Sequence, residues 1–223
     1  MATTEETIYI LDMDGTIIDS AEALIHAQSE GLERLANQSK RKDEFLDELK
    51  SGKSLKNIVT DLTPNNVDSP INNFFNNFYQ TPNVELAFQN GQYKLFEDFD
   101  EWNKQTSGKK ILISNSTKTA TQAKANLYDL NFDGVHGEFE EGKSKPSIYM
   151  GIKALAELTK KYPSLQLSKL KIINIGDNET DMEFGSNIRE FFTNYEIENI
   201  LVNRKGNTNS KYADRIIESF EEL

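Results

Sequence analysis

The amino-acid sequence predicts an α/β fold built on a parallel β-sheet. Short apolar runs with the length of buried strands recur along the chain and alternate with helical patterns or loops. These runs are Ile8–Leu11, Ile111–Ser114, Ile172–Ile175 and Ile200–Val202. Such alternation is typical of a parallel sheet covered by helices. The 223 residues, 37% of them apolar, are enough for one domain with an insertion or for two small domains.

The stretch from about Ser20 to Val84 differs from the rest, because its apolar residues recur at helical spacing without a convincing strand. Its later part, Pro64–Asn83, is rich in Asn and is interpreted as a helix with an aromatic core face; a disordered segment is the alternative. We therefore predict a helical cap domain, residues 19–86, inserted into a core domain of residues 1–18 and 87–223.

Composition restricts the partners and the compartment. The net charge of −11 argues against nucleic acids and anionic membranes as partners, since both are polyanions. The chain has no Cys, which excludes disulfides and thiolate catalysis and suits a reducing compartment. No signal-peptide pattern is evident at the N-terminus, and no apolar run approaches the ~20 residues of a membrane span. We expect a cytoplasmic protein, as a monomer or a homodimer.

Polar side chains follow the predicted strands where parallel sheets bind their ligands, outside the carboxyl ends of the strands. In chain order they are Asp12, Asp14, Ser114, Asn115, Lys145, Asp177 and Asp181. Each motif alone is a common turn, helix cap or surface charge, and Pro146 suits the first turn of a helix. The ordered set indicates a site. Its carboxylates repel one another unless a divalent cation is bound or some of them are protonated, and oxygen ligands favour Mg²⁺ with a phosphate completing its coordination.

The ordered motifs resemble those of the haloacid dehalogenase superfamily. They read Asp12-Met13-Asp14-Gly15-Thr16, Ser114-Asn115, Lys145-Pro146 and Gly176-Asp177-Asn178-Glu179-Thr180-Asp181. The insertion directly after the first motif resembles the C1-type cap of the phosphoglycolate phosphatase and β-phosphoglucomutase-like branch. The resemblance covers essentially the full chain and implies a Rossmann-like, three-layer α/β/α core. Dehalogenase members lack the second aspartate, so its presence favours phosphoryl transfer.

The residue chemistry and the resemblance suggest the same catalytic roles. Asp12 is the candidate nucleophile, whose carboxylate would attack phosphorus and form an aspartyl-phosphate. Asp14 would protonate the leaving oxygen and then activate water as a base. Ser114 and Asn115, with neighbouring backbone N–H groups, would bind the phosphoryl oxygens. Lys145 would neutralise developing charge and keep Asp12 ionised.

The metal ligands follow from the resemblance. Asp177 would bind Mg²⁺ together with Asp12 and the Asp14 carbonyl, and Asp181 would act directly or through a water. Lys143 is an alternative to the lysine at 145, although the Lys-Pro pair matches the motif better.

The predicted cap would select the substrate. Gly52 and Lys53 lie where related caps carry a substrate-specificity loop, and an exposed lysine beside a helix is the alternative interpretation. The sequence thus predicts a Mg²⁺-dependent phosphatase acting on a small phosphomonoester. A phosphomutase and a non-catalytic binding protein on the same scaffold are the alternatives. The spacing of His26 from Asp14 does not match the mutase pattern. A non-catalytic protein has no chemical need for all four of Asp12, Asp14, Lys145 and Asp177.

Overall fold

The computed structural model describes residues 5–23, 26, 81–137, 143–167, 169–204, 206 and 209–223. The chain divides into two compact units, Met1–Asp19 with Lys94–Leu223, and Ser20–Tyr93. The predicted boundary between residues 86 and 87 falls inside helix α5, Thr81–Gln89, which belongs to the second unit. Most of the predicted cap lies outside the described residues. Its helical structure, and with it the role of Gly52 and Lys53, therefore stays a prediction.

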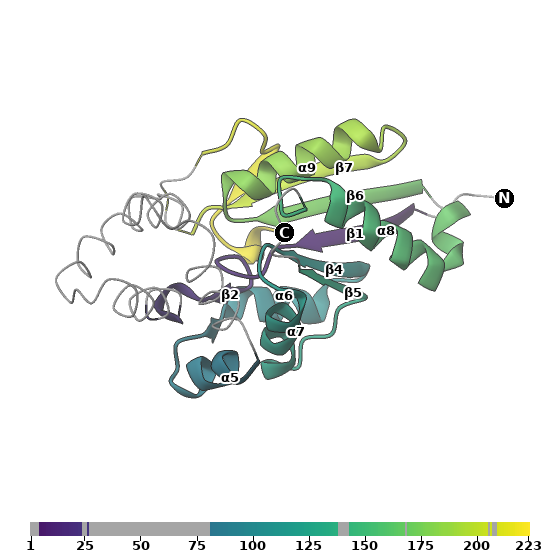
Figure 1. Ribbon diagram of the computed structural model, residues 1–223. Helices are drawn as coiled ribbons and strands as arrows, with labels where there is room; N and C mark the ends of the chain where they lie inside the picture. The colour runs from purple at the N-terminus through teal and green to yellow at the C-terminus, as the bar shows by residue number, and fades with distance from the viewer. Residues whose placement is uncertain are drawn as a thin grey trace, which may run out of the picture. The chain divides into compact units, whose positions relative to one another are not determined.

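The first unit contains a six-stranded sheet in the order β5-β4-β1-β6-β7-β8, and all of its neighbouring strands are parallel (Figure 1). The strands are β1 Glu5–Leu11, β4 Lys109–Ser114, β5 Gly134–Gly137, β6 Lys169–Gly176, β7 Glu196–Val202 and β8 Arg215–Ile217. The predicted parallel α/β fold is confirmed, and the four predicted strands lie within β1, β4, β6 and β7. Strand β5 was not predicted from the sequence, and neither was the small antiparallel pair formed by β2, Ile18–Asp19, and β3, Lys94–Leu95.

Helices follow the strands in the alternation that the sequence predicts. Besides α5, they are α6 Glu97–Gln105, α7 Lys118–Leu127, α8 Tyr149–Lys161 and α9 Glu179–Phe191, with short 3-10 helices η2 Pro163–Leu167 and η3 Phe220–Glu222. The expected helix start at Pro146 is wrong, because α8 begins only at Tyr149 and Pro146 lies in the preceding turns. Within the described ranges, every helix is too short or too polar to cross a membrane.

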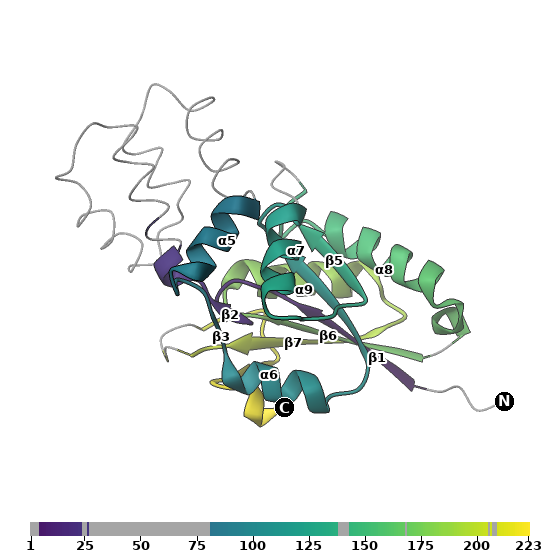
Figure 2. The same ribbon diagram turned by 90° about the horizontal axis from the view of Figure 1, so that it is seen from below.

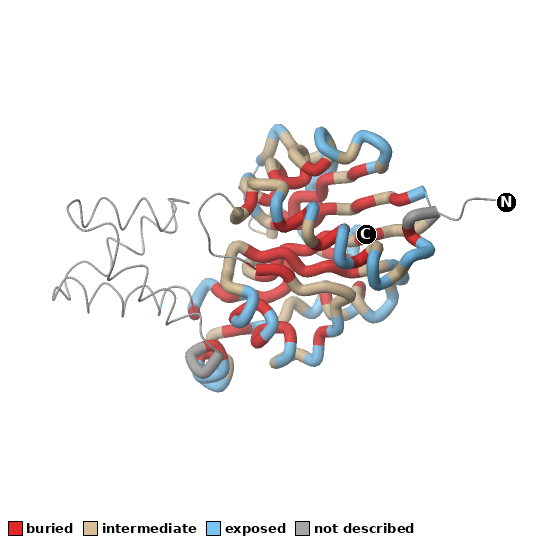
Figure 3. The backbone as a smooth tube through the Cα atoms, turned by 45° about the vertical axis from the view of Figure 1, so that its right-hand side comes forward, coloured by how far each residue is buried: buried red, intermediate tan, exposed pale blue. Residues whose placement is uncertain are grey.

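The sheet separates two packed layers. Helices α8 and α9 lie on one side, and α6 lies on the other with the C-terminal η3 (Figure 2). The first layer packs the apolar faces of α8 and α9 on the central strands, through buried residues that include Met150, Leu158, Phe184 and Ile188. In the second layer, the rings of Tyr9, Phe99, Trp102 and Phe220 form a cluster with centroids 5.0 to 5.8 Å apart. Buried residues accordingly concentrate in the strands (Figure 3).

The strand register places the carboxyl ends of the three central strands at one level. Leu11, the last residue of β1, is paired with Leu112 of β4 and with Ile175 of β6. The Asp12 N–H extends this pairing by donating to the Ile175 carbonyl at 3.0 Å. Residues that follow these strands therefore emerge together at one edge of the sheet, which is where the sequence predicts a site.

Candidate active site

The loop after β1 is a tight turn that needs glycine. The Gly15 N–H donates to the Ile18 carbonyl at 2.8 Å, and Gly15 has a φ of 90°, in a region that L side chains rarely adopt. A Cβ at this position would lie 2.2 Å from the Asp177 Oδ2 atom. Glycine therefore serves both the turn and the close approach of Asp177 to the loop that carries Asp12 and Asp14.

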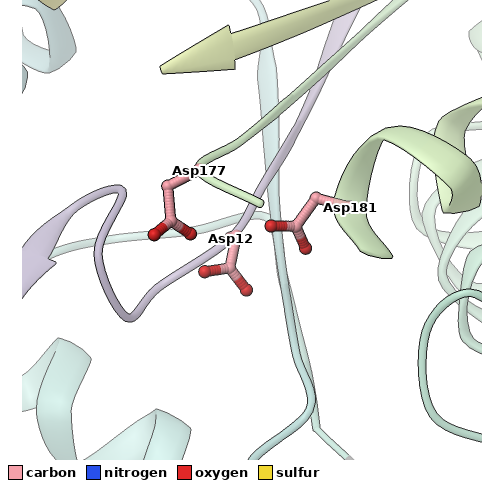
Figure 4. Close-up of side chains that lie close together, drawn as sticks. All are labelled: Asp12, Asp177 and Asp181. Atoms are coloured by element: carbon pink, nitrogen blue, oxygen red, sulfur yellow. The ribbon is translucent and has the colours of Figure 1, made fainter. Parts of the chain in front are cut away.

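Three carboxyl groups meet at this edge of the sheet. Asp12 follows β1, Asp177 follows β6, and Asp181 lies in the first turn of α9 (Figure 4). One oxygen atom from each lies within 4.8 Å of the others. The predicted metal ligands Asp12, Asp177 and Asp181 are thus brought together, and a set of hard oxygen donors at this spacing fits a divalent cation such as Mg²⁺.

Asp181 is also held by the helix that carries it. Asn178, the N-cap of α9, accepts a hydrogen bond from the Asp181 N–H at 3.2 Å, and the Asp181 Oδ2 atom accepts one from the Asn178 N–H at 3.3 Å. This capping box satisfies two N–H groups at the helix start. It also occupies one oxygen of Asp181, which orients the other toward the site.

Lys145 is the cation of the cluster. Its buried ammonium group donates to Asp12 Oδ1 at 2.5 Å, to Asp181 Oδ1 at 2.5 Å and to the Ile113 carbonyl at 3.0 Å. These bonds use all three donors of the group. The alternative, Lys143, has its ammonium 5.3 Å from the centroid of the Tyr149 ring. The geometry therefore supports the lysine that the sequence favoured.

Asn115 positions Lys145 through its side chain. Its Oδ1 atom accepts a hydrogen bond from the Lys145 N–H at 2.7 Å, and its Nδ2 atom donates to the Lys145 carbonyl at 3.3 Å. The Ser114 hydroxyl is buried at the end of β4 and accepts from the Ser116 N–H at 3.1 Å. Of the predicted phosphate-binding residues, Lys145 contacts the cluster directly, the Asn115 amide binds the Lys145 backbone, and Ser114 lies at the end of β4.

The electrostatics of the cluster favour the binding of a cation. Burial raises the pKa of Asp12 well above its usual value against the effect of Lys145, and Asp181 and Asp177 raise it further. Burial and Asp181 raise the pKa of Asp177 to about 7. Burial disfavours the Lys145 ammonium, yet Asp12 and Asp181 outweigh it and raise the Lys145 pKa. Three carboxyl groups lie beside one ammonium, and a divalent cation would favour their ionised forms.

The side chain of Asp14 lies apart from the three clustered carboxylates. Its oxygens accept hydrogen bonds from the Lys124 ammonium at 2.6 and 2.8 Å, and Oδ2 accepts one from the Ser116 hydroxyl at 3.4 Å. The assignment of Asp14 as a metal ligand through its carbonyl stays a prediction. Sequence reasoning missed Lys124, although helical spacing after the buried Ala120 and Thr121 places it on the inner face of α7.

Arg204, also missed, braces the loop after β1. Its guanidinium group donates to the Asp98 carboxylate at 2.8 Å and to the Thr16 carbonyl at 3.2 Å, and it lies 3.7 Å from the centroid of the Phe96 ring. Burial opposes ionisation of Asp98, but hydrogen bonds from Arg204 and from the Phe220 N–H lower its pKa. Arg204 thus connects α6 and the C-terminal segment to the loop that carries the catalytic candidates.

Fold and site together define an α/β protein with a carboxylate and lysine cluster at the carboxyl ends of its parallel strands. The family comparison then identifies the family. Residues 9–192 match the model of the haloacid dehalogenase-like hydrolases, and the chain belongs to this family. This confirms the resemblance seen in the sequence motifs. None of the curated proteins matches the chain.

Solved structures share the fold at low sequence identity. A haloacid dehalogenase-like hydrolase from Bacteroides fragilis is 19% identical, with a TM-score of 0.67 over 98% of this chain and 99% of that one. CbbY from Rhodobacter sphaeroides, solved with phosphate, is 16% identical, with a TM-score of 0.66 over 97% and 95%; a mutant of it was solved with xylulose-1,5-bisphosphate. The hydrolase YfnB from Bacillus subtilis, bound to magnesium, is 15% identical, with a TM-score of 0.60 over 99% and 97%.

Proposed function

We propose that this protein is a Mg²⁺-dependent phosphatase that hydrolyses a small-molecule phosphomonoester through an aspartyl-phosphate on Asp12. The observation that carries the proposal is the pairing of two aspartates with different surroundings. Asp12 is buried beside Lys145 and two further carboxylates, whereas the side chain of Asp14 is 28% exposed and lies against Lys124. Family membership adds hydrolase chemistry to this arrangement.

Asp12 and Asp14 divide the reaction between them. One oxygen of Asp12 is bound by Lys145, so the other is the candidate to attack phosphorus. The bond from Asp12 to phosphorus forms, the bond to the leaving oxygen breaks, and Asp14 gives that oxygen its proton. Asp14 then takes a proton from a water molecule, whose oxygen attacks phosphorus. The bond to Asp12 breaks, phosphate leaves, and both aspartates return to their starting states.

The groups around Asp12 stabilise charge. Lys145 holds one Asp12 oxygen and would offset charge that develops on a phosphoryl group attacked by Asp12, and the Ser114 hydroxyl at the end of β4 would bind a phosphoryl oxygen. Asp12 and Asp177, with the Asp14 carbonyl, are the proposed Mg²⁺ ligands. Bound Mg²⁺ would neutralise phosphoryl oxygens and draw the substrate toward Asp12. Both Asp181 oxygens accept hydrogen bonds from the protein. We therefore propose that Asp181 orients Lys145 and that it would contact Mg²⁺ only through a water molecule.

The structural neighbours support the choice of ligand and metal. CbbY was solved with phosphate and with a sugar bisphosphate, and YfnB with magnesium, so the same fold accommodates a phosphorylated small molecule or a divalent ion. By the same analogy we propose that the unit Ser20–Tyr93 acts as the cap that selects the ester. A cytoplasmic location is part of the proposal, because a chain without cysteine suits a reducing compartment.

Phosphate release from a panel of phosphomonoesters tests the function. We expect release with Mg²⁺, loss of release with EDTA, and no release above background from Asp12→Asn. Asp129→Asn makes the same chemical change at an exposed position of the core unit and should keep wild-type activity. Thermal unfolding of each variant checks that it is folded. Wild-type protein that releases no phosphate from any ester, or a fully active Asp12→Asn, would refute the proposal.

A further inference from the structure

Lys124 is a buried cation that the mechanism above does not use. The residue is 1% exposed, on a helix face that it shares with the buried Ala120 and Thr121. Lysine is almost never fully buried unless its charge is paired. Its ammonium group lies 2.6 and 2.8 Å from the two oxygens of Asp14, which precedes it by 110 residues in the chain. The contact is therefore made by the tertiary fold.

The contact determines where the Asp14 carboxyl group points. Asp14 lies in the tight loop after β1, and its side chain is 28% exposed, so it is free of close packing on one side. Lys124 contacts both of its oxygens, and the Ser116 hydroxyl contacts Oδ2 at 3.4 Å. Both partners come from the segment that begins with Ser114 at the end of β4 and continues into α7. The carboxyl group of Asp14 is thus tied to this segment and is not part of the carboxylate cluster.

We propose that Lys124 is a positioning residue for the reaction, which holds the carboxyl group of Asp14 where it exchanges protons with the leaving oxygen and with water. The inference rests on the proposed function, because it assigns Lys124 a role through Asp14. Removing the cation from a buried ion pair also destabilises the folded protein, whatever the catalytic role of the pair. The test must therefore separate a loss of proton transfer from a loss of structure.

Leaving groups of different basicity make this separation. Phenyl phosphate releases a basic phenolate, whose departure is helped by a proton from Asp14, whereas 4-nitrophenyl phosphate releases a stable anion that needs no proton. For a reaction with a covalent intermediate, kcat/KM reports the steps up to release of the leaving group. General acid catalysis contributes about 10²–10⁴-fold. We expect Lys124→Met to lower kcat/KM about 10–100-fold for phenyl phosphate and less than about 3-fold for 4-nitrophenyl phosphate.

A double-mutant cycle with Asp14→Asn completes the experiment. Because Lys124 acts through Asp14, adding Lys124→Met to Asp14→Asn should reduce kcat/KM for phenyl phosphate no further. Lys118→Met, which removes an exposed lysine from the same helix, should match the wild type on both esters. Thermal unfolding with and without Mg²⁺ identifies variants that are not folded.

Each other result contradicts the inference. An equal loss on both esters, or additive losses in the double mutant, would make Lys124 a structural residue only. If Lys124→Met does not fold, the two esters are compared with Lys124→Arg instead, because arginine keeps the positive charge but places it differently. An equal loss of kcat/KM for both leaving groups would then refute the positioning role of Lys124. Wild-type protein that hydrolyses neither ester refutes the phosphatase proposal itself, and the role of Lys124 falls with it.

Discussion

Protonation of Asp177 links the stability of the metal-free protein to pH. Burial and the neighbouring Asp181 raise its pKa from 3.8 to about 7, against the opposing effect of Lys145. The folded state therefore binds this proton more tightly than the unfolded state between these two pKa values. The stabilisation is complete below pH 3.8 and is lost as the pH rises through about 7. Raising the pH should consequently destabilise the metal-free protein through this residue.

The size of the effect follows from the two pKa values. Between about pH 5 and about pH 8, the linkage relation gives a loss of at most about 3 kcal/mol in the free energy of unfolding. This is an upper limit, since Asp177 is half-buried and solvent weakens its interactions. Asn at position 177 has no carboxyl group to titrate, so Asp177→Asn should lose less stability over the same pH range than the wild type does.

Urea unfolding at the two pH values, in EDTA, measures both proteins. Asp98 and Asp133 have lowered pKa values and act with the opposite sign, but they are present in both proteins and cancel in the difference. The proposed Mg²⁺ site needs ionised carboxylates, so addition of Mg²⁺ should restore stability mainly at the higher pH and mainly in the wild type. The reasoning is refuted if the wild type and Asp177→Asn change equally with pH, or if the wild type gains stability relative to the variant.

Two further substitutions test the groups that hold the site. Lys145→Met leaves Asp12 and Asp181 without their buried cation. Activity should therefore fall by ~10²–10³-fold, and the free energy of unfolding in EDTA should decrease by about 3–5 kcal/mol. A variant as stable as the wild type would contradict this. Gly185→Ala would place a Cβ 1.8 Å from Asn199 Oδ1. This crowding should decrease the free energy of unfolding by about 1–3 kcal/mol and so lower the urea midpoint. Alanine ordinarily stabilises a helix interior relative to glycine, so a gain in stability would refute the crowding argument.

Several features of the protein were predictable because their signals are local. The four apolar runs are strands because a strand buried on both faces reads as a continuous apolar segment. Once these strands are parallel, Asp12, Ser114 and Asp177 must emerge at the same edge of the sheet, and the register places them there. The order of the motifs was likewise sufficient to indicate the family, which the match over residues 9–192 confirms.

Other features depend on contacts that a local pattern does not contain. Strand β5 has only four residues, two of them glycine, and becomes a strand by pairing with β4. The turns after Pro146 precede α8, so the proline does not mark a helix start.

The sequence by itself determined the sheet, the acidic motifs and the family, because apolar runs and motif order are properties of neighbouring residues. Only the tertiary structure decided that Lys145 bridges Asp12 and Asp181, that the Asn115 amide binds the Lys145 backbone, and that Lys124 holds Asp14. The partners in the Lys124 and Asp14 pair are 110 residues apart. A lysine on a helix is usually solvated. When the fold buries it beside the end of a strand that is distant in sequence, its charge is destabilising unless it is paired with an opposite charge.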